Sequence, residues 1–252
     1  LFRSGNIGKR HLRLAHEETQ CNVVAVADPA PDSAAIAAEF GARHYTSAAD
    51  LLAREPDLDG AIIATPNNQH VNVGIACVEH KIPILVEKPV ADTLAGGEAL
   101  IAAAKQHGVA VAVGHHRRFD PSIDAAKSAL DDGAIGRLLA VECLWAMRKH
   151  DTYYEADWRR TPPSGGPALI NLVHDIDLMR FLCGDIVRLS AEGGAIAREH
   201  AVEDTLAIHV RFASGAVGTV LASDAAPSPW GWELGTGENP AIPQTGRNCY
   251  RL

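Results

Sequence analysis

GNIGKRHL at residues 5–12 and VVAVAD at residues 23–28 decide the fold of this chain. The first segment is a glycine turn that opens a helical pattern, and the second is an apolar strand pattern that ends in an acidic residue. Glycine lets the backbone approach a pyrophosphate, which the free N–H groups of a helix N-terminus then bind. The acid lies 20 residues after Gly8, where a carboxylate accepts hydrogen bonds from ribose hydroxyls. The two segments therefore predict a dinucleotide site on a βαβ unit.

The acid of this pattern, Asp28, also bears on the choice of cofactor. A carboxylate repels a ribose 2′-phosphate, so we expect NAD rather than NADP. A complete G-x-G-x-x-G pattern would have glycine where this chain has Arg3, and Arg10 lies nearby on the expected helix. Without a cofactor, Asp28 would only start the turn that it forms with Pro29.

Residues 5–113 alternate between short apolar runs and longer helical patterns rich in Ala or Leu. We expect strands over residues 23–27, 60–64, 82–86 and 110–113. We expect helices over residues 7–18, 33–40, 70–79 and 93–106. The strands are apolar throughout, as in a parallel sheet that helices cover on both faces. This alternation predicts an α/β fold that begins with a Rossmann domain, a doubly wound parallel sheet.

The pattern changes after Gly114. An Arg-rich loop leads to a helix from about residue 121, and further elements are expected at 138–145, 174–182, 204–212 and 218–223. Runs of strands with few helices predict a C-terminal α+β domain with a mostly antiparallel sheet. We therefore expect a Rossmann domain at 1–118 and a substrate-binding and oligomerisation domain at 119–252, in a sequence that is cut short at both ends.

Composition limits the classes of function. The formal net charge is −8 and the cationic residues are scattered, which argues against a nucleic-acid partner. No apolar run approaches the roughly 20 residues of a membrane span. The five cysteines form no C-x-x-C pair, which favours a reducing compartment and a cytoplasmic protein. We expect no metal site, because His115 and His116 would point to opposite sides of a strand, and His174 with Asp177 lacks a third ligand.

Five further motifs follow along the chain. They are ATPNNQH at 64–70, EKP at 87–89, GHHRRFDP at 114–121, GGP at 165–167 and HDID at 174–177. In their order and spacing the chain resembles the Gfo/Idh/MocA family of oxidoreductases, named for glucose-fructose oxidoreductase and inositol dehydrogenase, over nearly its whole length. The resemblance implies an NAD(P)-dependent dehydrogenase that acts on CH–OH groups.

The lysine of the EKP motif is the first catalytic candidate. In the family this lysine touches the nicotinamide ribose and the substrate, so the resemblance assigns Lys88 to the active site. Lys88 also follows an apolar strand, at the edge where open α/β sheets bind ligands, and Pro89 restricts it to an extended or turn conformation. Partial desolvation beside an oxidised nicotinamide would lower the pKa of the amine, which suits proton transfer. An exposed lysine at a strand end is the alternative.

The histidine after the GGP turn is the second catalytic candidate. The resemblance places His174 at the family's catalytic histidine, where an imidazole can take the proton of an alcohol while hydride leaves the same carbon. Many family members have aspartate four residues earlier, whereas this chain has Ile170 with Asn171 beside it. Asn171 can hydrogen-bond a substrate hydroxyl or orient His174, but it supplies no negative charge. A helix cap or a core position is the alternative for His174.

The expected sites comprise two sets of residues. Cofactor binding is assigned to Gly5, Asn6, Ile7, Gly8, Asp28, Thr65, Pro66, Asn67, His70, Glu87 and Lys88. Substrate binding is assigned to Lys88, Arg118, Trp158, Asn171 and His174. Arg118 could instead form a salt bridge within its loop. The aromatic loop could contact a sugar-like ring or a partner subunit, through Tyr153, Tyr154, Trp158 and Arg160. Asp175 and Asp177 are expected to interact favourably with a helix dipole.

These patterns together predict an NAD-dependent oxidoreductase. Hydride would pass between a nicotinamide and a secondary alcohol of a sugar, inositol or related polyol, with Lys88 and His174 converging on the reaction and handling the proton. The alternative is a non-catalytic, NAD-binding regulatory protein of the same fold, which Arg3 and Ile170 favour. We expect a homo-oligomer, a dimer or tetramer, because a sheet with one face uncovered by helices favours association.

Overall fold

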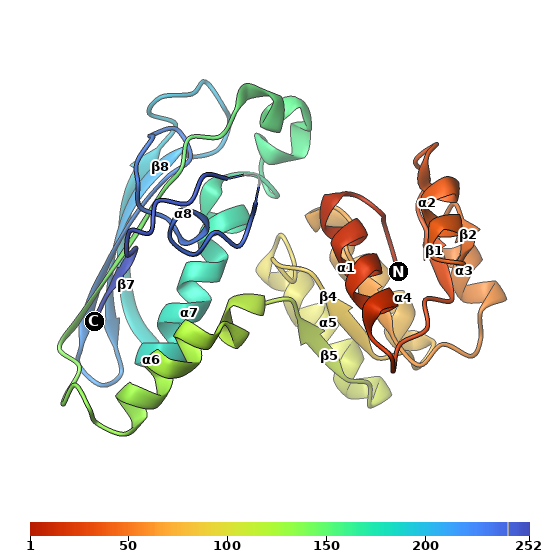
Figure 1. The fold of residues 1–252 in the computed structure, drawn as a ribbon, viewed down its shortest axis with the longest axis horizontal. Helices are drawn as coiled ribbons and strands as arrows, with labels where there is room; N and C mark the ends of the chain where they lie inside the picture. Colours follow the sequence, from red (N-terminus) through yellow and green to blue (C-terminus); the bar gives the residue numbers. More distant parts are fainter. Residues whose placement is uncertain (241) are drawn as a thin grey trace. The chain divides into compact units, whose positions relative to one another are not determined.

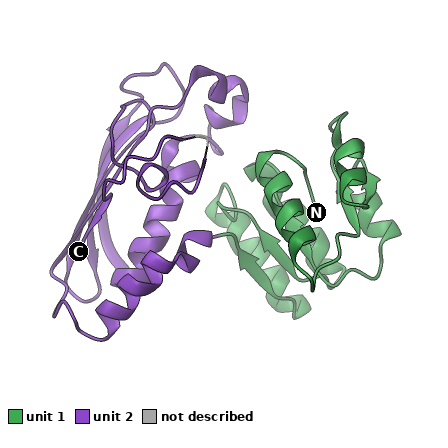
Figure 2. Cartoon of the chain, viewed as in Figure 1, with its two compact units in different colours: residues 1–114 green, residues 115–252 purple. Residues whose placement is uncertain are grey.

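A computed structural model describes residues 1–240 and 242–252 of the chain. The chain divides into two compact units, Leu1–Gly114 and His115–Leu252, which Figure 2 shows in different colours. The expected boundary after residue 118 lies four residues beyond this division. The difference arises because Arg117 and Arg118 form ion pairs with carboxylates of the second unit, so the segment that carries them folds with that unit.

The first unit contains a parallel sheet. Its strands are β1 (Ala25–Ala27), β2 (Arg43–Tyr45), β3 (Ala61–Ile63), β4 (Ile84–Val86) and β5 (Val111–Val113). β1 pairs with β2, while β3, β4 and β5 pair in that order, all in parallel. Phe2 forms bridges to Ala27 and Ile63 and so joins the two groups of strands. β1, β3, β4 and β5 lie within the predicted runs, and the Rossmann architecture is confirmed.

Helices connect the strands of this unit. They are α1 (Asn6–Glu17), α2 (Ser33–Glu39), α3 (Ala48–Arg54), α4 (His70–Glu79) and α5 (Leu94–His107), with a 3₁₀ turn, η1 (Asn67–Gln69), before α4. Side-chain hydroxyls cap two of them: Ser47 accepts from the N–H of Asp50 in α3, and Thr93 accepts from the N–H of Gly96 in α5. Gly108 ends α5 in a left-handed conformation, with φ of 66°.

The second unit contains a mixed sheet. Its strands are β6 (Ala140–Ala146), β7 (Ile186–Gly194), β8 (Thr205–Phe212), β9 (Val217–Ser223) and β10 (Tyr250–Arg251). Their order across the sheet is β10-β6-β9-β8-β7; β6 and β9 are parallel, and the other pairs are antiparallel. Residues of β6 alternate between buried and more exposed positions, as expected where only one face meets a core. The prediction of a mostly antiparallel sheet is confirmed.

The helices of the second unit gather on one side of this sheet. They are η2 (His116–Phe119), α6 (Pro121–Asp131), η3 (Asp151–Glu155), η4 (Asp157–Arg159), the π-helical η5 (Ala168–Leu172), α7 (Val173–Cys183) and α8 (Trp232–Thr236). α6 and α7 lie along one face of the sheet, where Trp145, Met179 and Phe212 are part of the core (Figure 1). Within the described ranges, no helix combines the length and the apolar character needed to cross a membrane.

Candidate active site

The turn before α1 has the backbone of a dinucleotide-binding glycine motif. Arg3 has φ of 79°, a left-handed conformation that glycine adopts more easily, so the residue departs from the motif while the backbone keeps a glycine-like conformation. A Cβ on Gly8 would lie 2.1 Å from the carbonyl oxygen of Arg3, so only glycine lets α1 approach the turn this closely. A Cβ on Gly5, the N-cap of α1, would meet no atom within 4 Å. Gly5 and the first helical residues, Asn6 and Ile7, are exposed and accessible to a phosphate.

Asp28 is held firmly beside this turn. The residue is 4% exposed, and its carboxylate accepts hydrogen bonds from Ser4 N at 2.7 Å, Ser4 Oγ at 2.8 Å and Ala30 N at 3.0 Å. Arg3 Nη1 lies 3.2 Å from the same carboxylate. Burial opposes ionisation of this carboxyl, but the hydrogen bonds from Ser4 and Ala30 and the charge of Arg3 outweigh it, so the pKa of Asp28 is lowered. An ionised carboxylate thus follows β1, where the sequence pattern predicts a ribose acceptor.

The segment after β3 presents a hydroxyl without a hydrogen-bond partner. Thr65 Oγ1 is buried, and no described residue lies in hydrogen-bonding geometry with it. His70, at the start of α4, is 1% exposed, and its ring nitrogens lie 2.7 Å from Pro89 O and 2.8 Å from Thr65 O. The ring therefore joins the turns after β3 and β4, and the expected contact of His70 with the cofactor stays a prediction. Pro66 precedes η1, and Asn67 is buried as its first residue.

The EKP turn after β4 is fixed by its glutamate. Glu87 is buried, and its carboxylate lies 2.7 Å from His11 Nε2 and accepts a hydrogen bond from the backbone N–H of Lys88 at 3.2 Å. A Cβ on Gly114 would lie 3.1 Å from this carboxylate, so glycine leaves it room. Burial opposes ionisation of Glu87, but the hydrogen bond and charge of His11 outweigh it, and the pKa of Glu87 is lowered. Lys88 is half-buried and precedes Pro89 through a cis peptide bond.

These groups fit a nicotinamide dinucleotide. The open position at Gly5 and the N-terminus of α1 suit a pyrophosphate. The Asp28 carboxylate suits a ribose, and the Thr65 hydroxyl can supply a further hydrogen bond. Most of the predicted cofactor residues therefore lie on the turn before α1 or at the carboxyl ends of β1, β3 and β4.

His174 lies beside two other histidine rings of the second unit. It is 5% exposed near the start of α7, and its ring centroid is 5.0 Å from that of His116 and 6.0 Å from that of His115. The expectation that His115 and His116 point to opposite sides of a strand was wrong, because the chain enters η2 here and both rings lie edge-on to His174. His116 Nε2 is 3.2 Å from Glu238 Oε2, and His115 Nδ1 is 3.7 Å from Asp177 Oδ2. In the part of the chain that the structure describes, no three His, Cys, Asp or Glu side chains are placed to hold a metal ion.

Asn171 lies in the π-helical segment η5, which runs directly into α7. Its half-buried side chain makes no hydrogen bond to any described residue. π-Helical turns within helices occur frequently at functional sites. The amide of Asn171 is therefore available to a ligand, while Ile170 beside it is buried.

A buried ion network supports the helix that carries His174. Arg117 is 3% exposed and lies 3.3 Å from Asp175 Oδ1 and 3.1 Å from Glu233 Oε1. Asp175 also accepts a hydrogen bond from the Tyr250 hydroxyl. Burial raises the pKa of Asp175, and the charge of Arg117 and the Tyr250 hydrogen bond offset this only in part. Asp175 therefore anchors α7 to η2 in addition to any interaction with the helix dipole.

Arg118, expected to bind substrate, is paired within its own unit. Its Nε donates to Asp177 Oδ2 at 2.7 Å and its Nη2 donates to Oδ1. The guanidinium also lies 5.2 Å from the ring centre of Phe181. The hydrogen bonds to Asp177 raise the pKa of Arg118. This bidentate salt bridge occupies guanidinium donors that a substrate would need. The structure therefore shows Arg118 in its alternative role, as part of a salt bridge.

The aromatic loop after β6 brings two cations against aromatic rings. Lys149 Nζ lies 5.5 Å from the ring centre of Trp145 and 5.4 Å from that of Tyr153. Arg159 Cζ lies 4.2 Å from the ring centre of Tyr153 and 5.1 Å from that of Trp158. The sequence did not single out Lys149 or Arg159, because neither belongs to a motif and only the folded loop places them over the rings.

Two other residues of this loop have partners elsewhere. Arg160, which could contact a sugar-like ring or a partner subunit, pairs with Asp157 three residues earlier. Tyr154 is buried, and its hydroxyl donates to Asp224. Burial and this hydrogen bond raise the pKa of Tyr154. Tyr153 and Trp158 are the two residues of this set whose rings lie beside Arg159.

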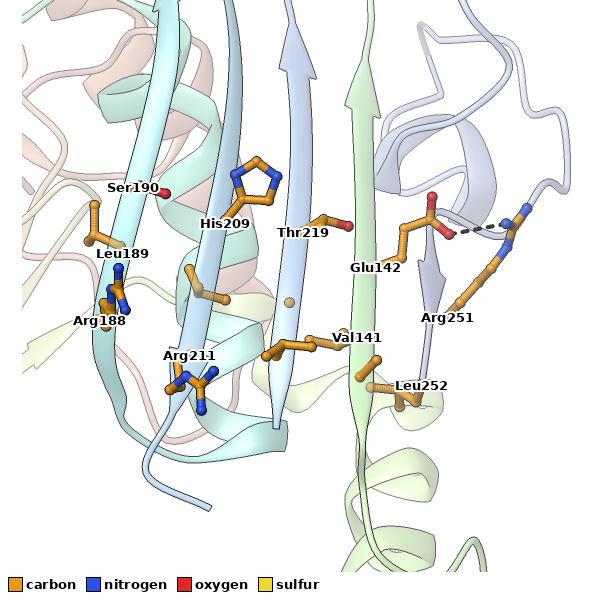
Figure 3. Close-up of a pocket in the computed structure, with 14 residues that line it drawn as sticks. Val141, Glu142, Arg188, Leu189, Ser190, His209, Arg211, Thr219, Arg251 and Leu252 are labelled. Atoms are coloured by element: carbon orange, nitrogen blue, oxygen red, sulfur yellow. Dashed lines mark hydrogen bonds and ion pairs between the residues drawn. The ribbon is translucent and has the colours of Figure 1, made fainter. Parts of the chain in front are cut away.

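The open face of the mixed sheet carries a shallow hollow, shown in Figure 3. Arg188 of β7, His209 of β8 and Thr219 of β9 line it. Glu142 of β6 pairs there with Arg251 of β10 at 3.0 Å. This face contains none of the residues predicted to bind cofactor or substrate.

Two family profiles together cover most of the chain. Residues 4–115 match the profile described as an oxidoreductase family with an NAD-binding Rossmann fold. Residues 123–237 match the profile of the GFO/IDH/MocA C-terminal domain.

Similar proteins agree with these matches. The rhizopine catabolism protein MocA of Rhizobium meliloti is 31% identical over 191 residues, which are 73% of this chain and 56% of that protein. The scyllo-inositol 2-dehydrogenase (NAD(+)) of Bacillus subtilis strain 168 is 30% identical over 245 residues, 91% of this chain and 67% of that protein. The crystal structure of the WlbA dehydrogenase from Bordetella pertussis in complex with NADH and UDP-GlcNAcA superposes with a TM-score of 0.85 at 27% identity, and the match covers 89% of this chain and 71% of that one. The chain thus spans only part of each relative, and it belongs to the GFO/IDH/MocA family of oxidoreductases.

Proposed function

We propose that the protein is an NAD-dependent oxidoreductase that transfers a hydride between the nicotinamide and a secondary alcohol of a sugar, inositol or related polyol. The observation that carries this proposal is the turn before α1, where Gly8 allows close approach and Gly5 leaves room for a phosphate beside the Asp28 carboxylate. The relatives support the substrate class, since one is named a scyllo-inositol 2-dehydrogenase and another was crystallised with NADH and UDP-GlcNAcA.

The residues of the chain would handle the proton of this reaction. When bound, the cofactor supplies the hydride donor or acceptor. Lys88, just after β4, carries an amine, and His174, near the start of α7, carries an imidazole; either group can take the proton of a hydroxyl. Asn171 would orient the hydroxyl or the His174 ring through its free amide. The same groups return a proton in the reverse direction, so both directions use one set of side chains.

Substitution of the two proton-handling residues tests this assignment. We expect Lys88→Met and His174→Asn each to lower kcat for an accepted polyol by about 100-fold or more, because general acid–base catalysis contributes roughly 10²–10⁴-fold. The assay follows NADH formation from NAD with a panel of inositols and sugars. NADH binding, measured by fluorescence titration, should persist in His174→Asn.

Lys105→Met is the matched control, since Lys105 is exposed on α5 and should not affect turnover. Full turnover by both Lys88→Met and His174→Asn would remove these residues from the mechanism. NADH binding by the wild-type protein without reduction of NAD by any member of the panel would instead favour a non-catalytic, NAD-binding regulatory protein.

We also propose that the open face of the mixed sheet associates with a second copy of the chain. Val217 and Leu221 of β9 lie on this face with Thr219 and are exposed, although they are apolar. Side chains of this kind on a sheet face without a covering layer favour burial against a partner. Analytical ultracentrifugation should give a dimer or tetramer, and Leu221→Lys should shift it toward the monomer. A monomeric wild-type protein would reject the proposal.

A further inference from the structure

Lys149 and Arg159 are cations of the aromatic loop that lack a carboxylate partner. Among the described residues, neither side chain has a carboxylate oxygen within 4.0 Å. Arg159 Nη1 donates to the backbone oxygen of Tyr153 at 2.6 Å, and Arg159 Nε is buried without a hydrogen-bond partner. Both cations lie over the ring of Tyr153, at 5.4 Å and 4.2 Å from its centre, so they are no more than about 10 Å apart.

The two carboxylates whose charges act on Lys149, Asp224 and Glu233, each interact with other side chains. Asp224 accepts a hydrogen bond from Tyr154 and lies 3.7 Å from Arg198 Nε. Glu233 accepts hydrogen bonds from Arg117 and from the Trp145 indole, each at 3.1 Å. Neither carboxylate forms an ion pair with Lys149 or Arg159.

Burial makes an unpaired ammonium costly at this position. Desolvation lowers the pKa of Lys149, and the charges of Glu233 and Asp224 offset that effect only in part. Contacts with Trp145 and Tyr153 stabilise the cation without neutralising it. An anionic group of a ligand would supply the missing partner.

The backbone ties Arg159 to the segment that carries the candidate catalytic groups. Gly166 N donates to Arg159 O at 3.2 Å, and a Cβ on Gly165 would lie 2.7 Å from the same oxygen. The GGP turn therefore packs tightly on the backbone of Arg159. It leads directly into η5 and α7, with Asn171 and His174. A ligand group held by Arg159 would thus be anchored to the same backbone segment as Asn171 and His174.

We propose that Lys149 and Arg159 bind a carboxylate of the substrate, so that the preferred substrate is a polyhydroxylated acid, a uronate or an aldonate, and not a neutral polyol. The inference rests on the proposed function and narrows its substrate class. Lys149 provides the charge partner, Arg159 provides planar donors suited to carboxylate oxygens, and the rings of Tyr153 and Trp158 contact the apolar face of the sugar.

Matched pairs of ligands test the inference without any substitution. Isothermal titration of the NADH-loaded protein compares D-glucuronate with D-glucose and D-galacturonate with D-galactose, which differ only in the oxidation state of one carbon. We expect at least one acid to bind about 10-fold or more tightly than its neutral partner, the range of a charge-assisted contact. Equal or weaker binding of both acids would overturn the inference. Tighter binding of D-glucose 6-phosphate than of D-glucuronate would also overturn it, in favour of a phosphate.

Substitutions then assign the effect to the two cations. Lys149→Met and Arg159→Met should weaken binding of the preferred acid about 10- to 100-fold and leave the neutral sugar nearly unchanged, whereas Arg159→Lys should recover part of the loss. Lys127→Met, on α6, is the control and should bind like the wild type. An equal loss for acid and neutral sugar would show a structural role and overturn the inference. Acid-selective binding without NADH formation from NAD would leave the inference standing and reject the oxidoreductase proposal.

Discussion

Replacement of Gly8 by alanine tests the close approach of α1 to the glycine turn. The new Cβ would lie 2.1 Å from Arg3 O. Cβ atoms in proteins essentially never come closer than 3.0 Å to another heavy atom, so the two atoms would be about 0.9 Å too close. The obstructing atom belongs to the backbone, and Arg3 N is hydrogen-bonded to Ala27 O, so the turn cannot yield as a side chain would. Gly8→Ala must therefore push α1 away from the sheet or distort the turn.

The size of the effect follows from two opposing contributions. Overpacking of this kind costs about 1–3 kcal/mol. Alanine is the better helix former and returns roughly 0.5–1 kcal/mol. We expect a net loss of about 1–2 kcal/mol in the free energy of unfolding, which lowers the melting temperature by about 2–8 °C for a chain of this length.

Gly5→Ala is the matched control for this prediction. Gly5 has φ of −63°, which alanine adopts readily, and its Cβ would meet no atom within 4 Å. We expect its urea midpoint to stay near that of the wild type, while NADH binding weakens by about 10-fold because the methyl group fills the space left for a phosphate. Wild-type stability of Gly8→Ala, or wild-type NADH affinity of Gly5→Ala, would refute the reasoning.

Two further predictions concern buried charges, one in each unit. Asp28→Asn should lower the urea midpoint at neutral pH. Because the pKa of Asp28 is lowered from 3.8, the ionised carboxylate stabilises the fold above that pH, and this stabilisation is lost as the pH falls below it. The urea midpoints of wild type and variant should therefore converge in acid. Equal urea midpoints of wild type and Asp28→Asn at neutral pH would contradict this prediction. Arg117→Met should lower the free energy of unfolding by about 3–5 kcal/mol, because it leaves Asp175 and Glu233 buried without their partner. Arg180→Met, in an exposed pair with Asp185, is the control, and equal midpoints for the two variants would reject the network's role.

The sequence predicted those elements of the fold that a local pattern of residues specifies. The glycine turn and the continuously apolar strands specify a covered parallel sheet, and four observed strands fall inside the predicted runs. The sequence analysis missed β2 because Arg43–Tyr45 is short and polar. It missed α3 because seven residues span too few helical turns to show a clear helical periodicity. β7 was missed because nearly all of its residues are exposed, so it has no alternation of buried and exposed positions.

The candidate site could be predicted only where a motif marks it. Gly8, Asp28 and the EKP turn lie at positions that local chemistry specifies, and the structure places them in the first turn of α1, after β1 and after β4. Lys149 and Arg159 have no such marker, because their role depends on rings brought near them by the fold. The burial of His70 likewise depends on the fold and could not be predicted from its motif.

The ring of His70 has a consequence for how substitutions combine. Because one imidazole contacts the carbonyl oxygens of Thr65 and Pro89, the two turns cannot relax independently. Changes at Thr65 and Lys88 should therefore be non-additive in a double-mutant cycle, and the coupling energy should vanish in a His70→Ala background. A buried residue would thereby set the cooperativity between two loops that are 23 positions apart in the chain.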